Sequence, residues 1–272
     1  MNYEEYIQKR FEGHLDAFNK KFPNLELVYM AVQGSQNYGL DYYGDGYCSD
    51  LDTKAIVLPS LDDIVQDKQP LSFVYVLENN EHIDIKDIRV MFEMFKKQNI
   101  NFIEILFSHY NYINPKYADF FKELIINREK IARYNHNQTL RCIAGMSMEK
   151  LKAMCHPYPT IKDKIDKYGY DGKQLHHIIR MNDFMYAFVV LGMSYEASLS
   201  HFKDKDLLFD AKFNKFSLED ALCLAERYDN DTKELKEKFS KDVEKTDKEV
   251  EELLNKVKYQ CIKKHILEEV RK

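Results

Sequence analysis

The sequence contains no tryptophan, few prolines (6) and few glycines (9), and no apolar run long enough to span a bilayer. A transmembrane helix requires about 18 or more consecutive apolar residues, so a membrane-spanning segment is not expected. Residues 1–15 carry charges where a secretory signal peptide requires an apolar segment. Internal repeats and low-complexity linkers are also missing. We therefore expect a cytoplasmic protein with no membrane partner.

The cysteines form no Cys-x-x-Cys pair. They are odd in number and widely spaced, at Cys48, Cys142, Cys155, Cys223 and Cys261. This pattern is typical of free thiols in a reducing compartment. The histidines show no metal-ligand spacing either, so a zinc site is not expected.

A strong positive charge is also missing, because the formal net charge is -5 and the isoelectric point is near 6.0. A chain with this charge has no global attraction for a polyanion, and any contact with nucleic acid must use a local basic patch. The composition, with 44% hydrophobic and 31% charged residues, is that of a soluble globular protein. The 272 residues suffice for two modest domains.

The first part of the chain alternates between one helical pattern and several strand patterns. Apolar residues at steps of three and four over residues 3–22 predict an amphipathic helix. Short apolar or alternating runs predict strands over 25–34, 51–59, 71–78 and 81–88. Asn79 and Asn80 suit a hairpin turn between the last two strands. The pattern then becomes helical from residue 88, with Asn101 as the expected N-cap of a second helix.

Beyond residue 115 the patterns are helical, with segments expected near 117–126, 138–154, 173–192, 195–202, 217–228 and 231–270. Strands followed by helices predict an α+β catalytic domain over residues 1–115 and an all-helical domain over 116–272. The last segment spaces its apolar residues close to a heptad. We expect a long helix that packs on its own domain, with a homodimeric coiled coil as the alternative.

Two short motifs carry the chemistry. Residues 34–40 read Gly-Ser-Gln-Asn-Tyr-Gly-Leu, and residues 49–52 read Ser-Asp-Leu-Asp. Alternate side chains of a strand share one face, so Asp50 and Asp52 point the same way and form an oxygen-ligand site for magnesium. Gly34 and Ser35 directly follow a strand, where backbone amides and a hydroxyl can approach a phosphate. A phosphate-binding turn beside a carboxylate pair predicts phosphoryl or nucleotidyl transfer.

These motifs resemble the polymerase-β nucleotidyltransferase superfamily. More narrowly, they are similar to bacterial and phage nucleotidyltransferases with Gly-Ser-x-x-Tyr-Gly before Ser-Asp-x-Asp. The resemblance continues in residues 87–89 and 101–106 and in the helix that follows Asp171, and it covers roughly residues 25–190. It implies a small mixed sheet of the polymerase-β type in the first domain.

The resemblance also implies roles for single residues. Two magnesium ions are held by Asp50, Asp52 and a third carboxylate, for which we choose Asp84. Glu81 and Asp87 are rivals, although Asp87 is also a favourable N-cap for the helix that begins at Ile88. Gly34 and Ser35 hold the phosphates of a nucleoside triphosphate. Glu104 lies in a helical apolar pattern, and we interpret it as a structural residue that bonds the end of the sheet.

Other candidate nucleotide-binding residues are less specific. Tyr38 either stacks on a base or supports the loop, and the sequence leaves both open. Lys173, His177 and Arg180 lie at steps of four and three on one helix stripe, where they would neutralise phosphate charge. The alternative is an exposed polar face. Lysines and tyrosines interleave over residues 158–170, and we interpret this stretch as a solvated loop, with a nucleic-acid contact as the alternative.

The leading hypothesis is a magnesium-dependent nucleotidyltransferase that moves a nucleoside monophosphate from a triphosphate to an acceptor hydroxyl. The alternative is a catalytically silent nucleotide-binding module, and a third reading is an interaction protein that acts through its C-terminal helix. The sequence leaves open which nucleotide is used. It also leaves open whether the acceptor is RNA, such as a transfer-RNA end, DNA, a protein or a small molecule.

Overall fold

The computed structural model describes residues 2–44, 46–243 and 245–271, which fold into two compact units. The first unit runs to Tyr134 and also contains the segment from Thr246 onward. The second unit is Asn135–Lys245. The expected boundary after residue 115 therefore lies inside the first unit, which the C-terminal helix joins.

The first unit is built on a mixed five-stranded sheet with the strand order β5-β6-β4-β1-β7. Strand β1 pairs antiparallel with β4 and β7, β5 pairs antiparallel with β6, and β4 and β6 are parallel. The strands are β1 (Glu26–Gln33), β4 (Asp52–Leu58), β5 (Ser72–Val76), β6 (His82–Asp87) and β7 (Asn111–Ile113). A two-stranded ribbon, β2 (Tyr43–Gly44) and β3 (Tyr47–Cys48), lies in the loop before β4. The mixed sheet followed by helices confirms the α+β fold class.

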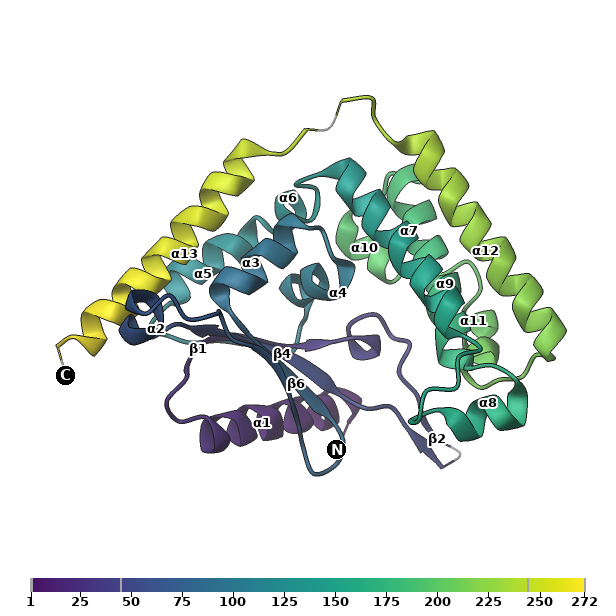
Figure 1. Ribbon diagram of the computed structural model, residues 1–272, viewed down its shortest axis with the longest axis horizontal. Coiled ribbons are helices and arrows are strands. Elements are labelled where there is room, and N and C mark those ends of the chain that lie inside the picture. Colours follow the sequence, from purple (N-terminus) through teal and green to yellow (C-terminus); the bar gives the residue numbers. More distant parts are fainter. Residues whose placement is uncertain (1, 45, 244, 272) are drawn as a thin grey trace. The chain divides into compact units, whose positions relative to one another are not determined.

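Helix α1 (Tyr3–Lys21) covers one face of this sheet, on the lower side in Figure 1. Asn2 caps the helix, and its side chain and that of Glu5 bond reciprocally to the two backbone N–H groups. Buried residues of α1, such as Phe11 and Phe18, pack with Leu51 and Ile83 of the sheet region. Because side chains alternate along a strand, this packing decides which residues of β4 and β6 face away from α1.

The other face of the sheet is covered by the remaining helices of the first unit (Figure 1). These are α3 (Ile88–Lys96), α4 (Ile100–Ile103), α5 (Ala118–Ile126), α6 (Arg128–Ala132) and α13 (Lys248–Glu269), with α2 (Leu61–Val65) beside them. Short 3₁₀ helices follow β1 and α4, at η1 (Ser35–Asn37) and η2 (Glu104–Phe107). Asn99 caps α4 and accepts from the backbone of Asn101, so the expected cap at Asn101 was two residues too late.

The second unit contains helices and no strand among its described residues. Helices α7 (His136–Ala153), α9 (Gly172–Met185) and α12 (Leu218–Phe239) pack on one another, and α11 (Lys205–Lys212) packs on α9. Shorter elements complete it: α8 (Lys162–Tyr168), a π-helical turn η3 (Tyr186–Val190) and α10 (Tyr195–Leu199). The lysine-rich stretch that was expected to be a loop thus contains helix α8.

The single helix expected over residues 231–270 was wrong, because two helices occupy this region. Helix α12 ends at Phe239, and α13 begins at Lys248 with Asp247 as its N-cap. The heptad-like apolar residues of α13 are buried within the first unit, where α13 packs on α5 and α3; they are Val250, Leu254, Val257 and Cys261. The apolar spacing of α13 therefore reflects packing on its own unit.

Candidate active site

The sheet brings the two motifs together at one end of β4. In the antiparallel pair β1–β4, Gln33 lies opposite Asp52, and Gly34 follows at once. Directly opposed residues of antiparallel strands have Cα atoms about 5 Å apart. Gly34 has φ +90°, a conformation that glycine adopts without strain, and its N–H donates to Glu104 Oε1 at 2.8 Å. Glu104 thus bonds the end of the sheet, as the sequence predicted.

A second link runs from the Gly-Ser turn to Asp50. The Gln36 side chain is buried, and its Nε2 donates to the main-chain oxygen of Asp50 at 2.7 Å and to Tyr43 Oη at 3.2 Å. The turn and the carboxylate motif are therefore joined by a direct hydrogen bond. The sequence offered no signal for this role, because an amide in a loop has many alternative partners.

The side chains of the Asp-Leu-Asp motif alternate as expected. Leu51 is fully buried in the core beneath α1, whereas Asp50 is exposed and Asp52 is half-buried. Asp52 Oδ1 accepts from the backbone N–H of His82 at 2.9 Å and lies 3.1 Å from its ring Nδ1. Among the described residues, no hydrogen bond is made to Asp52 Oδ2. One carboxylate oxygen is thus held while the other is available to a ligand.

The donor chemistry of this site fits magnesium. Mg²⁺ prefers carboxylate oxygens, and proteins commonly hold it with one or two carboxylates while substrate phosphates and waters complete its shell. Asp50 and Asp52 supply two such groups. Within residues 2–44, 46–243 and 245–271, however, no group of three His, Cys, Asp or Glu side chains is arranged to hold an ion.

Asp84, the expected third carboxylate, shares a sheet face with Asp52. Its strand β6 runs parallel to β4, with Asp84 opposite Lys54. The Asp84 carboxylate pairs with Lys54 Nζ at 2.7 Å and with Lys86 Nζ at 3.0 Å. Lys54 is buried and also lies 4.1 Å from the centre of the Phe102 ring. The structure thus gives Asp84 two ammonium partners, and a role in binding metal stays a prediction.

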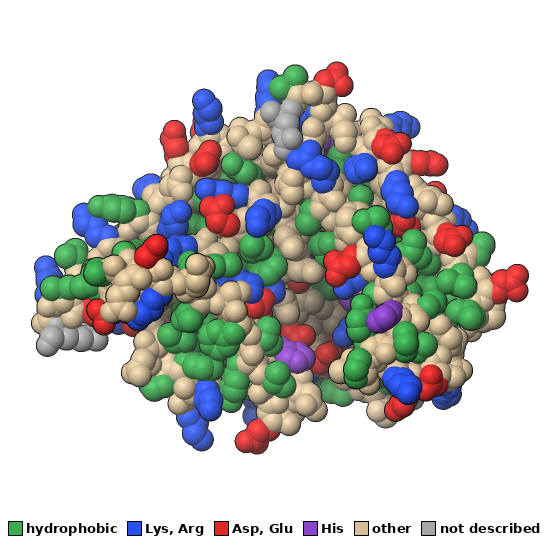
Figure 2. Space-filling view, viewed as in Figure 1, with side chains coloured by type: hydrophobic (Ala, Val, Ile, Leu, Met, Phe, Trp, Pro, Cys, Tyr) green, Lys and Arg blue, Asp and Glu red, His purple; other side chains and the backbone are tan. Residues whose placement is uncertain are grey.

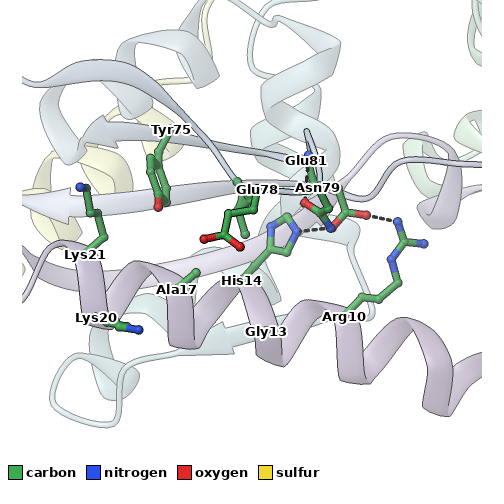
Figure 3. Close-up of a pocket in the computed structure, with 11 residues that line it drawn as sticks. Arg10, Gly13, His14, Ala17, Lys20, Lys21, Tyr75, Glu78, Asn79 and Glu81 are labelled. Atoms are coloured by element: carbon green, nitrogen blue, oxygen red, sulfur yellow. Dashed lines mark hydrogen bonds and ion pairs between the residues drawn. The ribbon is translucent and has the colours of Figure 1, made fainter.

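Glu81, the first rival of Asp84, lies on the opposite face of the sheet. There it pairs with Arg10 and with His14 Nε2, the latter at 2.9 Å (Figure 3). Burial disfavours a charge on Glu81, but the hydrogen bonds from His14 and Arg10 outweigh burial and lower its pKa to about 2. Glu81 is therefore an ionised carboxylate whose two oxygens are both bonded to side chains on the α1 face of the sheet. It is not a metal ligand beside Asp52.

Asp87, the second rival, caps helix α3. Its Oδ1 accepts from the backbone N–H of Arg89 at 2.8 Å, and its Oδ2 pairs with the Arg89 guanidinium at 2.7 Å. The predicted N-cap role is confirmed. Both carboxylate oxygens of Asp87 are therefore bonded to Arg89 at the N-terminus of α3, which is a structural role.

The RNA repair pathway DNA polymerase beta family (RlaP) matches residues 7–182 of the chain, which is more than half of its length. The chain belongs to this family. This membership identifies a polymerase-β-like nucleotidyltransferase, in agreement with the resemblance inferred from the motifs.

A nucleotidyltransferase-like protein from Exiguobacterium sibiricum is similar in structure, with 12% sequence identity and a TM-score of 0.31 over 84% of this chain and 75% of that chain. No curated protein matches the sequence.

The family match includes the Gly-Ser turn, where Tyr38 is only 7% exposed. A ring buried to this extent packs within the loop, which favours the supporting role over base stacking. Ser35 opens the 3₁₀ turn η1, and its main-chain oxygen accepts from the N–H groups of Tyr38 and Leu40. The turn is thus closed by its own backbone, with the Ser35 side chain half-buried.

The stripe of Lys173, His177 and Arg180 lies on α9 in the second unit, and it falls within the family match. Lys173 is exposed and Arg180 is buried. Burial, together with the neighbouring His176 and the cations Arg180 and Lys173, lowers the pKa of His177, so this ring is neutral near pH 7. The role of the stripe in binding phosphate stays a prediction.

Sequence reasoning missed three polar residues around the motif, Arg10, His14 and His82. A signal for one of them was present, because His14 shares the helical spacing of the buried residues Ile7, Phe11 and Phe18. A histidine on a buried helix face requires a hydrogen-bonding partner. His82 occupies an outward position in an alternating strand, and its contact with Asp52 depends on the parallel pairing of β4 with β6.

The distribution of charged side chains on the surface is consistent with the small net charge of the chain. On the face drawn in Figure 2, acidic and basic side chains are interspersed over both units, without a broad region of one sign. None of the described helices combines the length and the hydrophobicity needed to cross a bilayer. All five cysteines are free thiols, as the sequence predicted.

Proposed function

We propose that this chain is a magnesium-dependent nucleotidyltransferase that transfers a nucleoside monophosphate from a nucleoside triphosphate to a hydroxyl group of RNA. One observation carries the proposal: Gln33 lies opposite Asp52, so the Gly-Ser turn and the two aspartates lie at the same end of the sheet. The description of the family names an RNA repair pathway, which favours RNA as the acceptor. A protein or a small-molecule acceptor is an alternative outcome of the test.

The residues of the chain have separate tasks in this proposal. Asp50 and Asp52 hold the metal ions, and the Gly34–Ser35 turn binds the β- and γ-phosphates through its N–H groups and hydroxyl. Bound magnesium would lower the pKa of the acceptor hydroxyl and stabilise the leaving oxygen. The hydroxyl oxygen then bonds to the α-phosphorus, the bond between the α-phosphorus and the bridging oxygen breaks, and pyrophosphate leaves. The hydroxyl proton passes to solvent or to a carboxylate.

His82 holds Asp52 Oδ1 through both its backbone N–H and its ring. These two contacts restrict rotation of the carboxylate, and in this proposal Oδ2 binds the metal ion. Preorganisation of this kind supports catalysis because the charged groups need no rearrangement during the reaction. Lys54 and Lys86 add positive charge on the same sheet face, through their pairs with Asp84.

The proposal is tested by incubating the protein with Mg²⁺, each of the four α-labelled ribonucleoside triphosphates, and separate RNA, protein and small-molecule fractions of a cell extract. We expect label to enter RNA and pyrophosphate to be released in proportion. Asp50→Asn and Asp52→Asn should abolish labelling while the circular dichroism spectrum is unchanged, because neither carboxylate fills the core. Labelling that persists in both variants would end the assignment.

Other outcomes of the same experiment select among the alternatives. Label in the protein fraction would replace RNA by a protein acceptor. Triphosphate binding without label in any fraction would identify a silent nucleotide-binding module. Asp84→Asn tests the third carboxylate: a loss of kcat at unchanged stability indicates a catalytic role, whereas a loss of stability at unchanged kcat indicates that Asp84 only pairs with Lys54 and Lys86.

A further inference from the structure

The main chain on both sides of Asp50 is held by two side chains from the α1 face of the sheet. Arg10 Nη2 donates to the main-chain oxygen of Ser49 at 3.0 Å. Glu81 Oε1 accepts from the N–H of Leu51 at 3.2 Å. Arg10 and Glu81 also pair with each other, so the two peptide groups that flank Asp50 are part of a closed ring of hydrogen bonds.

These bonds are made where the sheet itself does not hold the chain. Pairing of β4 with β1 begins at Asp52, and pairing of β4 with β6 begins at Thr53. Asp50 thus precedes the paired residues of β4, and side chains that include Gln36, Arg10 and Glu81 bond to the main chain of residues 49–51. Side-chain hydrogen bonds therefore hold the main chain on both sides of Asp50.

A buried histidine completes the set. His14 is 2% exposed, and it lies between Glu81 Oε2 at 2.9 Å and the hydroxyl of Thr53 at 3.0 Å. Its two ring nitrogens therefore connect the carboxylate beneath the motif to the first residues of β4. Glu81 uses Oε1 for Leu51 and Arg10 and Oε2 for His14, so its loss removes one hydrogen-bond partner from each of these three residues.

We propose that Arg10, His14 and Glu81 are positioning residues of the active site, which hold the main chain of residues 49–51 so that Asp50 and Asp52 present their carboxylates together. This inference rests on the proposed function of the two aspartates. Arg10 and Glu81 act through hydrogen bonds to the main chain of the motif, and His14 acts through its bonds to Glu81 and Thr53. All three lie on the opposite face of the sheet from Asp52. Their expected effect is on the rate of the chemical step, because a displacement of about 1 Å at reacting groups costs about 10²-fold in rate.

The structure offers a direct way to test this set. A cavity of about 680 Å³ lies between α1 and the β5–β6 hairpin, and Arg10, His14 and Glu81 are part of its lining (Figure 3). Small solutes can therefore reach the space that a shortened Arg10 would leave. A guanidinium ion added to an Arg10→Ala variant can replace the lost donors at the main-chain oxygen of Ser49 and at Glu81.

The experiment compares wild type, Arg10→Ala and Arg10→Lys, with Phe18→Leu as a control. Phe18 is a buried residue of the same helix and belongs to the same core cluster as Leu51, but its apolar ring makes none of the hydrogen bonds to Glu81 or to residues 49–51. We expect Arg10→Ala to lose about 10²-fold in kcat with little change in the KM of the triphosphate. Millimolar guanidinium should restore much of this loss, and Arg10→Lys, which keeps the charge, should be intermediate. Phe18→Leu should lose stability but keep kcat.

A second measurement does not depend on activity. Hydrogen exchange of the peptide that contains Leu51 should accelerate more in Arg10→Ala and in Glu81→Gln than in Phe18→Leu, because Phe18→Leu keeps Glu81 as the acceptor of the Leu51 N–H. If Arg10→Ala folds and keeps its kcat, or if the exchange of Leu51 is unaffected, the positioning role is refuted. If wild type transfers no nucleotide, the proposed function fails, and the exchange data alone decide whether the set holds the main chain. Should Arg10→Ala not fold, Arg10→Lys carries the same test.

Discussion

The two units each contain a buried carboxyl group, and the two groups have opposite electrostatic behaviour. Glu81 of the first unit is 5% exposed, and its pKa is lowered to about 2. Asp183 of the second unit is 1% exposed, and its pKa is raised to about 6. Burial favours the neutral form of both groups. The difference must therefore come from the groups around each carboxyl.

Glu81 has close partners on both oxygens, because Arg10, His14 and the N–H of Leu51 all bond to it. Asp183 lies 3.9 Å from the ammonium of Lys203, and it receives one long backbone hydrogen bond of 3.4 Å. Among the described residues, its Oδ1 has no hydrogen-bond partner. A buried carboxyl group thus keeps its negative charge at low pH only where hydrogen-bond donors lie within bonding distance of its oxygens.

The largest expected effect is that of Glu81→Ala. This variant leaves the Arg10 charge and the His14 ring without their acceptor, and breaking one half of a buried ion pair costs about 3–5 kcal/mol. Urea unfolding at pH 7, followed by circular dichroism, should show this loss in the transition of the first unit. A loss below about 1 kcal/mol would show that water replaces Glu81, and the contrast with Asp183 would disappear.

Asp183→Asn should change stability in the opposite direction. The wild-type carboxylate is ionised at pH 8 although burial disfavours its charge, so the neutral amide should raise the free energy of unfolding by about 1–2 kcal/mol. This gain is smaller than the free energy that corresponds to the full pKa shift of Asp183, because Lys203 loses its charged partner in the variant. Urea unfolding at pH 8 measures the gain. A destabilised variant would show that the Lys203 contact outweighs the burial of Asp183.

The pH dependence of unfolding separates the two carboxyls further. The pKa of Glu81 is lowered from 4.5, so its contribution is present above pH 4.5 and is lost as the pH falls towards 2. The pKa of Asp183 is raised from 3.8, so its contribution is present below pH 3.8 and is lost as the pH rises through 6. Relative to wild type, Glu81→Gln should flatten the acid limb, and Asp183→Asn should flatten the fall between pH 4 and 6. Parallel profiles of all three proteins would contradict both assignments.

The smallest expected effect is that of Gly13→Ala. This variant changes the lining of the cavity without removing a polar side chain, so it serves as a control for the Glu81 variants. Gly13 lies in α1 between Arg10 and His14, and no atom lies within 4 Å of an added Cβ. Alanine in a helix interior is more favourable than glycine by about 0.5–1 kcal/mol. A small gain in the unfolding midpoint with unchanged kcat is expected. A loss would indicate that the space above Gly13 is needed for the polar set.

Much of the first unit could be predicted from the sequence, because local patterns carry the information. The period of α1, the alternation of β6 and the turn at Asn79 and Asn80 each follow from a few adjacent residues. The cap at Asp87 was also predictable, since a short polar side chain before an apolar helical run satisfies the first free N–H groups. These features require no knowledge of distant contacts.

Other expectations failed where local pattern was ambiguous. Apolar residues continue at helical spacing on both sides of residues 240–247, so a single helix was expected where α12 and α13 are separate. The break became visible only through the packing of α13 on the first unit. In the same way, the lysine-rich stretch has few apolar residues, and α8 carries no buried residue that would have marked it as a helix.

The sequence by itself determined the chemistry of the site: a glycine-serine turn after one strand, and two carboxylates separated by an apolar residue at the start of the next. It did so because the turn and the alternation of side chains are local properties of the chain. Only the tertiary structure decided which acids share the sheet face of Asp52 and which lie on the opposite face, against α1. Asp84, Glu81 and Asp87 are close in sequence, but strand pairing and helix packing give them different partners. Asp84 pairs with two lysines, Glu81 pairs with Arg10 and His14, and Asp87 caps helix α3. Partners of this kind come from distant segments, and their distances are set by the packing of α1 and the order of the strands.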